Sequence, residues 1–142
     1  MTNAVEKDVV MRQPVERVWA ALTTSDAIAQ WGYPNTFEAE VGREFTLSPP
    51  PNPQADFDGT VHCKVLECEP MKVLAFTWEG GPVVGTEARF ELAGNEEGTT
   101  SVRFRHTGFD LSQPWGEGAL RGAEFGWNMM LEKIENVAGA MD

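Results

Sequence analysis

Two neighbouring segments, 84–92 and 100–108, place apolar residues at every second position and charged residues between them. The apolar positions are Ala88, Phe90, Leu92, Val102 and Phe104, and the charged positions are Glu87, Arg89, Glu91, Arg103 and Arg105. Successive side chains of a strand point to opposite faces, so both segments predict strands with one apolar face and one face of cross-strand charge pairs. A sheet with one apolar face has to be covered by a second layer of structure.

The C-terminal segment, from about Glu117 to Met141, supplies that layer. Its apolar residues recur at spacings of three and four and fall within a stripe roughly 120° wide at 100° per residue, which predicts a long amphipathic helix. They are Leu120, Ala123, Trp127, Met130, Leu131, Ile134, Ala138 and Met141. A long helix laid across a strongly curved antiparallel sheet tends to leave a cavity between the two layers.

The N-terminal segment predicts one strand and two short helices. Residues 4–11 are rich in β-branched side chains and predict the strand. Pro14 suits the first turn of a helix over 14–22, whose apolar residues fall at i, i+3, i+4 and i+7. Ser25 is placed to cap a second short helix, and Gly32 is placed to end it.

The middle of the chain predicts an antiparallel meander. From Asn35 onward Phe37, Ala39 and Val41 alternate with acidic residues and predict its first strand, and Phe45 and Leu47 follow after a turn. The proline-rich segment 49–53 predicts a loop because proline donates no ladder hydrogen bond. Four further strands are predicted over 57–68, 72–78, 84–92 and 100–108, separated by turn residues.

Composition indicates one globular domain with a substantial core. The 142 residues are 42% hydrophobic, and 11 basic against 22 acidic side chains give a net charge of −11. Nucleic acid is excluded as a partner because its binding depends on clustered basic charge. The N-terminus does not resemble a secretory signal, and no apolar run approaches the roughly 18 residues of a membrane span, so we expect a cytoplasmic protein without a membrane partner.

The two cysteines, Cys63 and Cys68, lie five positions apart in one predicted strand. They therefore point to opposite faces, about 16 Å apart at 3.3 Å per residue. A disulfide requires Cα atoms within about 7 Å, so we expect two free thiols in a reducing compartment.

The order of these elements, taken with several short segments, resembles a known family. The segments are Pro14–Trp19, Trp31-Gly32, Val41-Gly42, Phe76-Thr77-Trp78, His106–Phe109 and Gly126-Trp127. They are similar to the domain homologous to the activator of the heat-shock-protein-90 ATPase, within the START-like or SRPBCC superfamily. The resemblance spans Ala4 to about Ala138. It implies a single α+β helix-grip domain over 1–142, in which a curved antiparallel sheet of about six or seven strands wraps around the long C-terminal helix. The same fold is shared by the birch pollen allergen and polyketide cyclases.

His106 is the most informative single residue. Its parity places it on the apolar face with Phe104, and the resemblance places a histidine there too. It either orients a ligand or exchanges a proton in the cavity, or it is a core histidine bonded to a backbone carbonyl or to Glu124. Glu124 lies at the border of the helical stripe, where it either meets His106 or reaches solvent.

Large aromatic side chains dominate the candidate ligand-binding set, as they do in small-molecule cavities. Trp31, Trp78 and Trp115 are candidates for the cavity mouth. The complete set is His106, Trp78, Trp31, Phe90, Phe104, Trp115, Glu124 and Trp127. Phe125 projects away from the buried stripe and is a candidate dimer or partner contact.

Three hypotheses about function follow. The leading one is binding of a hydrophobic or aromatic small molecule, such as a lipid, a polyketide or an aromatic metabolite, between the sheet and the C-terminal helix. It involves no catalytic residue, no cofactor and no metal, since His62 and His106 stand without clustered ligands. The second is a cyclase- or lyase-type enzyme with His106 and Glu124 as acid and base. The third is a co-chaperone-like interaction module using Phe125 or the loop 48–57. Monomer and homodimer both stay open.

Overall fold

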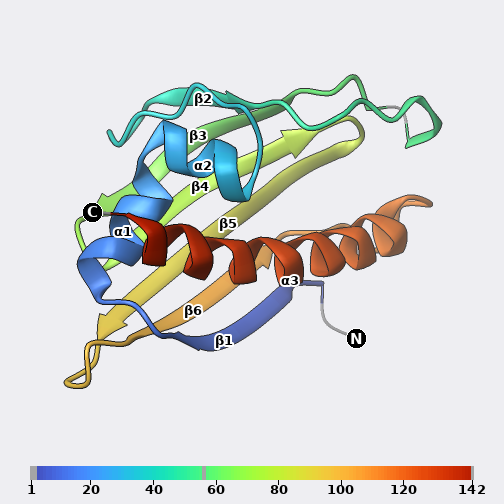
Figure 1. Ribbon diagram of the computed structural model, residues 1–142. Coiled ribbons are helices and arrows are strands. Elements are labelled where there is room, and N and C mark those ends of the chain that lie inside the picture. Colours follow the sequence, from blue (N-terminus) through green and yellow to red (C-terminus); the bar gives the residue numbers. More distant parts are fainter. Residues whose placement is uncertain (1–2, 56, 142) are drawn as a thin grey trace.

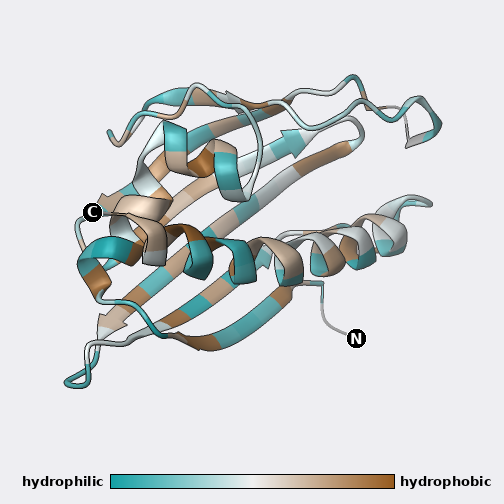
Figure 2. Ribbon diagram, in the orientation of Figure 1, coloured by the Kyte–Doolittle hydropathy of each residue, from teal (hydrophilic) through white to brown (hydrophobic). Residues whose placement is uncertain are grey.

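Six strands form one antiparallel sheet in the computed structural model, which describes residues 3–55 and 57–141. They are β1 (Val5–Met11), β2 (Glu44–Leu47), β3 (Val61–Glu69), β4 (Val73–Gly80), β5 (Val83–Gly94) and β6 (Thr100–Thr107). Their order across the sheet is β1-β6-β5-β4-β3-β2, so β1 and β2 are the edges. Teal and brown bands alternate along β5 and β6 in Figure 2, as the predicted two-faced strands require.

Three helices cover one face of this sheet, and the predicted α+β helix-grip architecture is confirmed (Figure 1). They are α1 (Val15–Thr23), α2 (Ser25–Trp31) and α3 (Gly116–Ala140), and a single 3-10 turn spans Pro53–Ala55. Apart from Gly116 at its start, the residues that α3 buries begin at Trp127, near its midpoint, and continue through its second half to Ala138. Both short helices pack against α3 and lie beside that same half in Figure 1. Its first half extends past them, and this asymmetry positions the site.

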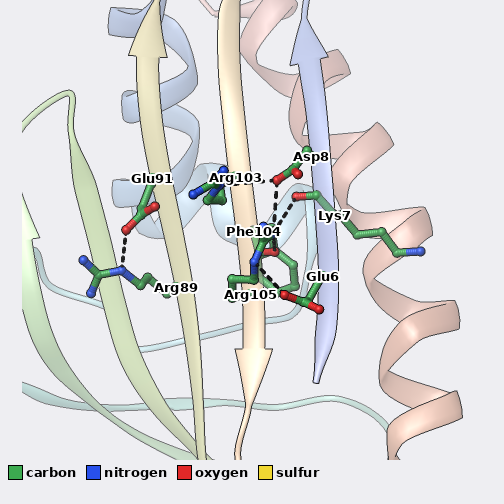
Figure 3. Close-up of polar contacts among 8 residues, drawn as sticks. All are labelled: Glu6, Lys7, Asp8, Arg89, Glu91, Arg103, Phe104 and Arg105. Carbon is green, nitrogen blue, oxygen red and sulfur yellow. Dashed lines mark hydrogen bonds and ion pairs between the residues drawn. The ribbon is translucent and has the colours of Figure 1, made fainter. Parts of the chain in front are cut away.

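The outer face of the sheet carries the predicted charge pairs, which join neighbouring strands except for the pair of Arg89 and Glu91 within β5 (Figure 3). The pairs are Arg105 with Glu6 at 3.2 Å and with Asp8 at 3.1 Å, Arg103 with Asp8 at 3.7 Å, and Arg89 with Glu91 at 2.8 Å. Arg89 also pairs with Glu67. These side chains are partly exposed, so each pair contributes at most about 1 kcal/mol. They are structural contacts on the face opposite the helices.

Two local predictions are wrong. The strand expected over Phe37–Val41 is absent, and only an isolated bridge joins Asn35 to Leu47. The Asn35 side chain accepts a hydrogen bond from the Phe37 backbone N–H, which turns the chain away from the edge strand β2. Ser25 does not cap α2: it is the first helical residue, and its hydroxyl donates to Asn35 Oδ1 at 2.8 Å instead.

Other local predictions are confirmed. Gly32 ends α2, and its N–H donates to the carbonyl of Ile28 at 2.7 Å. Cys63 and Cys68 are both free, and burial raises the pKa of Cys63 to about 12, so this thiol stays protonated at neutral pH. Within the described residues, no helix is both long enough and apolar enough to cross a membrane.

Candidate ligand-binding site

His106 lies beneath the first half of α3, on the helix-covered face of the sheet, and is only 1% exposed. Trp127 of α3 donates its indole Nε1–H to His106 Nδ1 at 3.0 Å. On the other side of the ring, Nε2 lies 3.1 Å from the hydroxyl oxygen of Thr86 on β5. That hydroxyl donates in turn to the backbone carbonyl of Trp78 on β4. Four residues from three strands and one helix therefore form one chain of hydrogen bonds.

The direction of this chain fixes the protonation state of His106. An indole nitrogen can only donate, so Nδ1 must be the accepting, unprotonated nitrogen. The Thr86 hydroxyl already gives its single proton to a carbonyl, so Nε2 must carry the proton and donate to Thr86. Only the neutral Nε2–H tautomer satisfies all three bonds.

The surroundings of His106 keep its imidazole neutral and engage both of its ring nitrogens in hydrogen bonds. Burial lowers its pKa from 6.5 to about 4. Protonating Nδ1 would also point a second N–H at the indole N–H of Trp127. Because both ring nitrogens are engaged, neither is free to exchange a proton with a substrate, as acid-base catalysis requires. The arrangement suits a positioning role at the base of a cavity.

An open cleft of about 620 Å³ lies over this histidine, between the sheet and the first half of α3. Aromatic and small apolar side chains make most of its wall, with Tyr33 and Asn52 adding polar groups. The lining residues are Tyr33, Pro49, Pro50, Asn52, Phe57, Val61, Trp78, Gly80, Pro82, Val83, His106, Phe109, Trp115, Gly118, Ala119, Gly122, Ala123, Gly126, Trp127 and Met130. The loop after β2 and the β4–β5 turn extend at the same end of the molecule as the first half of α3 (Figure 1).

Small residues on α3 hold this cleft open. Gly118, Ala119, Gly122, Ala123 and Gly126 line it, at spacings that place them along one side of the helix. A Cβ atom built on Gly118 or Gly122 meets nothing within 4 Å. The second half of α3 instead fills the space above the sheet with large residues.

A glycine after β6 shapes the floor of the cleft. Gly108 has φ +94°, and a Cβ there would lie 2.4 Å from the carbonyl oxygen of Gly85. Only glycine fits this close approach in a left-handed conformation. The turn brings the ring of Phe109 to 4.7 Å from the imidazole of His106, so an aromatic wall continues beyond the end of the strand.

The structure places four of the eight predicted ligand-binding residues on the cleft: His106, Trp78, Trp115 and Trp127. Trp31, Phe90 and Phe104 are instead packed in the core beneath it. Trp31 and Phe90 border only an internal gap of about 10 Å³, too small for a ligand, and Phe104 is completely buried. Core packing around the ring of Trp127 accounts for all three, with ring centroids 4.3 to 6.3 Å away.

Glu124 does not meet His106 and does not line the cleft. Its carboxylate lies 3.5 Å from Lys7 Nζ of β1 and is 55% exposed. Glu124 lies on the side of α3 that faces the sheet edge. Of the two positions expected from the sequence, beside His106 or in solvent, the structure shows the second.

Sequence reasoning missed several residues of the cleft wall. Tyr33, Asn52 and Phe57 come from loops, where no periodicity indicates direction. The glycines of α3 could have been found from the sequence. Gly118, Gly122 and Gly126 recur every fourth residue, which places small residues along one side of the helix. Within the described ranges, no cluster of His, Cys, Asp or Glu could hold a metal ion.

Comparison with known proteins gives one family and many similar folds. A family model described as Activator of Hsp90 ATPase homolog 1-like protein matches residues 12–139. Protein MLL2253 from Mesorhizobium loti is 30% identical, with 98% of each chain covered and a TM-score of 0.81. CalU16 from Micromonospora echinospora is 20% identical, with 95% of this chain and 75% of that chain covered and a TM-score of 0.75.

A further similar structure is the Aha1 dimer from Colwellia psychrerythraea. It is 21% identical, with 95% of each chain covered and a TM-score of 0.73. At identities this low, the likeness to CalU16 and to Aha1 shows the fold alone. The search of curated proteins gives no match.

Proposed function

Because the chain belongs to the family of Activator of Hsp90 ATPase homolog 1-like proteins, we propose that it is a START-like binding protein whose α3 cleft holds a hydrophobic or aromatic small molecule. The cleft itself carries the proposal. Its volume of about 620 Å³ lies in the range of small-molecule sites, roughly 300–1,000 Å³. Its wall combines many aromatic and aliphatic side chains with a few polar groups, which is the usual composition of such sites.

The glycines of α3 support a binding role, because they leave space open in the cleft although they make the helix less stable. A glycine inside a helix is less stable than alanine by roughly 0.5–1 kcal/mol. Gly118, Gly122 and Gly126 all lie inside α3 and line the cleft, and two of them have open space where a side chain would be. A helix serving only to cover the sheet would gain from larger residues here. Open volume kept at such a cost favours a functional cavity.

The test is a thermal-shift screen followed by calorimetry, using fatty acids, polycyclic phenols and aromatic metabolites. A ligand that binds only the folded chain raises its stability by about 2.7 kcal/mol at 100 times Kd. Gly122→Leu should fill the cleft and weaken binding of any ligand so found at least about tenfold. Asn128→Leu is the matched control, since Asn128 is exposed on α3 and outside the cleft wall. Equal affinity in the Gly122→Leu variant would mean that the ligand binds elsewhere.

Binding rather than catalysis is the proposed role because of His106. A general acid or base needs a nitrogen free to meet the substrate, and both nitrogens of this ring are engaged by Trp127 and Thr86. The second residue of the enzymatic hypothesis, Glu124, pairs with Lys7 instead of approaching His106. The cyclase- or lyase-type alternative therefore lacks its acid-base pair.

One observation favours protein interaction as a second candidate function. Phe125 is 70% exposed and Met129, one helical turn later, is 47% exposed. Two large apolar side chains side by side on a helix are a candidate contact for a partner such as Hsp90. Loss of Hsp90 binding in a Phe125→Ser variant would support this function, and absence of binding by the unmodified chain would remove it. Ultracentrifugation of the unmodified chain and of the Phe125→Ser variant tests whether Phe125 and Met129 join two copies of the chain in a homodimer.

A further inference from the structure

The wall of the cleft carries no charged side chain among the residues that the structure describes. Its twenty lining residues include no Asp, Glu, Lys or Arg. In the whole chain, by contrast, 23% of residues are charged. The charged residues of α3 nearest the cleft are directed to other partners: Arg121 pairs with Glu117 within the helix, and Glu124 pairs with Lys7.

The two titratable groups that do line the cleft are also uncharged near neutral pH. His106 is held as the neutral tautomer by Trp127 and Thr86. Tyr33 is a phenol whose pKa burial raises above 10.0. A ligand entering the cleft at pH 7 therefore meets neither a cation nor an anion on its wall.

Three residues of the cleft wall carry neutral polar groups. The Tyr33 hydroxyl, the Asn52 side-chain amide and the Trp115 indole N–H belong to residues of the cleft wall. None of the three has a hydrogen-bond partner among residues 3–55 and 57–141. Groups of this kind can bond to a hydroxyl, carbonyl or ether oxygen of a bound molecule.

We propose that the cleft selects uncharged aromatic ring compounds bearing neutral oxygen groups, and that it rejects carboxylates and ammonium ions of the same ring system. This inference rests on the proposed function. Moving an ion out of water costs several kcal/mol unless an opposite charge compensates, and the wall offers none. The net charge of −11 adds long-range repulsion for anions and long-range attraction for cations, and salt screens both. For an ammonium ion, contact with the faces of Trp78 or Trp115 returns only about 0.5–2 kcal/mol.

A matched series of three fluorescent ligands tests the selection. They are 9-anthracenemethanol, 9-anthracenecarboxylate and 9-anthracenylmethylammonium, which share one ring system and differ in charge. At pH 7.5 we expect the alcohol to bind and both ions to bind at least about tenfold more weakly. The difference should persist in 0.5 M NaCl, where the Debye length is only a few ångströms and long-range repulsion is screened.

A charge placed in the wall should reverse the preference. Asn52→Lys adds a cation to the lining, and we expect it to strengthen carboxylate binding at least about tenfold while weakening binding of the ammonium ion. Asn128→Lys changes the net charge equally but lies on the exposed side of α3, so it should leave the order of the three ligands unchanged. Equal effects of the two variants would assign the selection to net charge and overturn the inference.

The outcomes separate this inference from the proposed function. If the carboxylate or the ammonium ion binds the unmodified chain as tightly as the alcohol, and Gly122→Leu abolishes that binding, the cleft binds ligands but the charge selection is wrong. If none of the three binds and no compound in the screen binds either, the proposed function fails and this inference fails with it.

Discussion

Each ring nitrogen of His106 contacts a different layer of the fold. Nδ1 accepts from Trp127 on α3, and Nε2 donates to Thr86 on β5. Buried polar groups are stable only when they are bonded, so the imidazole and the two side chains depend on one another. The residue therefore fastens the helix to the sheet at the floor of the cleft, where the small residues of α3 provide little packing.

Replacing His106 should destabilise the fold strongly. His106→Leu leaves the buried indole N–H of Trp127 without an acceptor, which costs about 1–3 kcal/mol, and it disturbs packing beside Phe109 and Trp78. We expect unfolding free energy to fall by about 2–4 kcal/mol in urea denaturation. His62→Leu is the matched control because His62 is exposed, and it should change stability by less than about 0.5 kcal/mol. Equal effects of the two variants would contradict the hydrogen-bonded role.

The same residue predicts a pH dependence of stability. The pKa of His106 is about 4 in the folded chain and near 6.5 in the unfolded chain, so the unfolded state binds more protons as the pH falls. Its stabilising contribution is complete above about pH 6.5 and is lost as the pH falls toward 4. The contribution of His106 to the unfolding free energy should be about 2 kcal/mol smaller at pH 5 than at pH 7.5. Urea unfolding of the unmodified chain and of His106→Leu across this range measures this contribution as the difference between the two pH profiles, and parallel profiles would contradict the lowered pKa of His106.

For single residues, the sequence predicted which face of the sheet a side chain lies on but not which residues it bonds to. Alternation along β6 placed His106 on the buried face, and the structure confirms it. The predicted partners were a backbone carbonyl or Glu124, whereas the observed partners are Trp127 and Thr86. Which residue of α3 lies above which strand depends on the placement of the helix, and hydrophobic periodicity does not fix that placement.

Helix α3 combines two kinds of packing in one continuous element. From Trp127, near its midpoint, it buries large residues such as Leu131 and Ile134 against the sheet, and its first half presents glycine and alanine to the cleft. Its first residue, Gly116, is a different case: a Cβ there would lie 2.1 Å from the backbone carbonyl oxygen of Asp110. Glycine thus serves two purposes within one helix, open space in its interior and close packing at its start.

Alanine substitutions should separate these two purposes. Gly122→Ala adds a methyl group in open space and removes backbone freedom from the unfolded chain, so it should stabilise the fold by about 0.5–1 kcal/mol. Gly116→Ala should destabilise it by 1 kcal/mol or more, because a backbone carbonyl has to move. Thermal unfolding of the two variants checks the signs. Destabilisation by Gly122→Ala would contradict open space beside this residue.

Element prediction succeeded where a period was sustained and failed where it was short. The strands β5 and β6 and the helix α3 were predicted because apolar residues recurred over many positions. The three apolar residues of 37–41 alternate correctly, yet β2 offers that segment no continuous ladder, and Val41 is 60% exposed. A pattern of five residues cannot show whether a partner strand exists.

At the scale of the whole molecule, charge is separated from the cleft. Ion pairs among the described residues engage eight of the 11 basic side chains: Lys7, Arg12, Arg43, Lys72, Arg89, Arg103, Arg105 and Arg121. The outer sheet face holds several of these pairs (Figure 3). The architecture followed from the order of elements, but the uncharged cleft depends on loops and glycines whose direction the sequence did not indicate.

The excess of carboxylates predicts how salt affects stability. With 22 acidic and 11 basic side chains, repulsion across the surface exceeds the attraction of exposed pairs, each worth at most about 1 kcal/mol. Raising NaCl from 10 mM to 300 mM shortens the Debye length from about 30 Å to below 10 Å and screens this repulsion. We expect Tm to rise by about 3 °C or more, the shift that about 1 kcal/mol produces in a domain of this size.

A charge variant distinguishes repulsion from a general salt effect. Glu96 and Glu97 are exposed in the β5–β6 turn, and changing both to lysine moves the net charge from −11 to −11 + 4 = −7. This variant should have the higher Tm at 10 mM salt and the smaller rise at 300 mM, because less repulsion is left to screen. If salt instead lowers Tm in the unmodified chain, the ion pairs of the outer face contribute more than the repulsion does. The charge pairs in Figure 3 would then be a major source of stability.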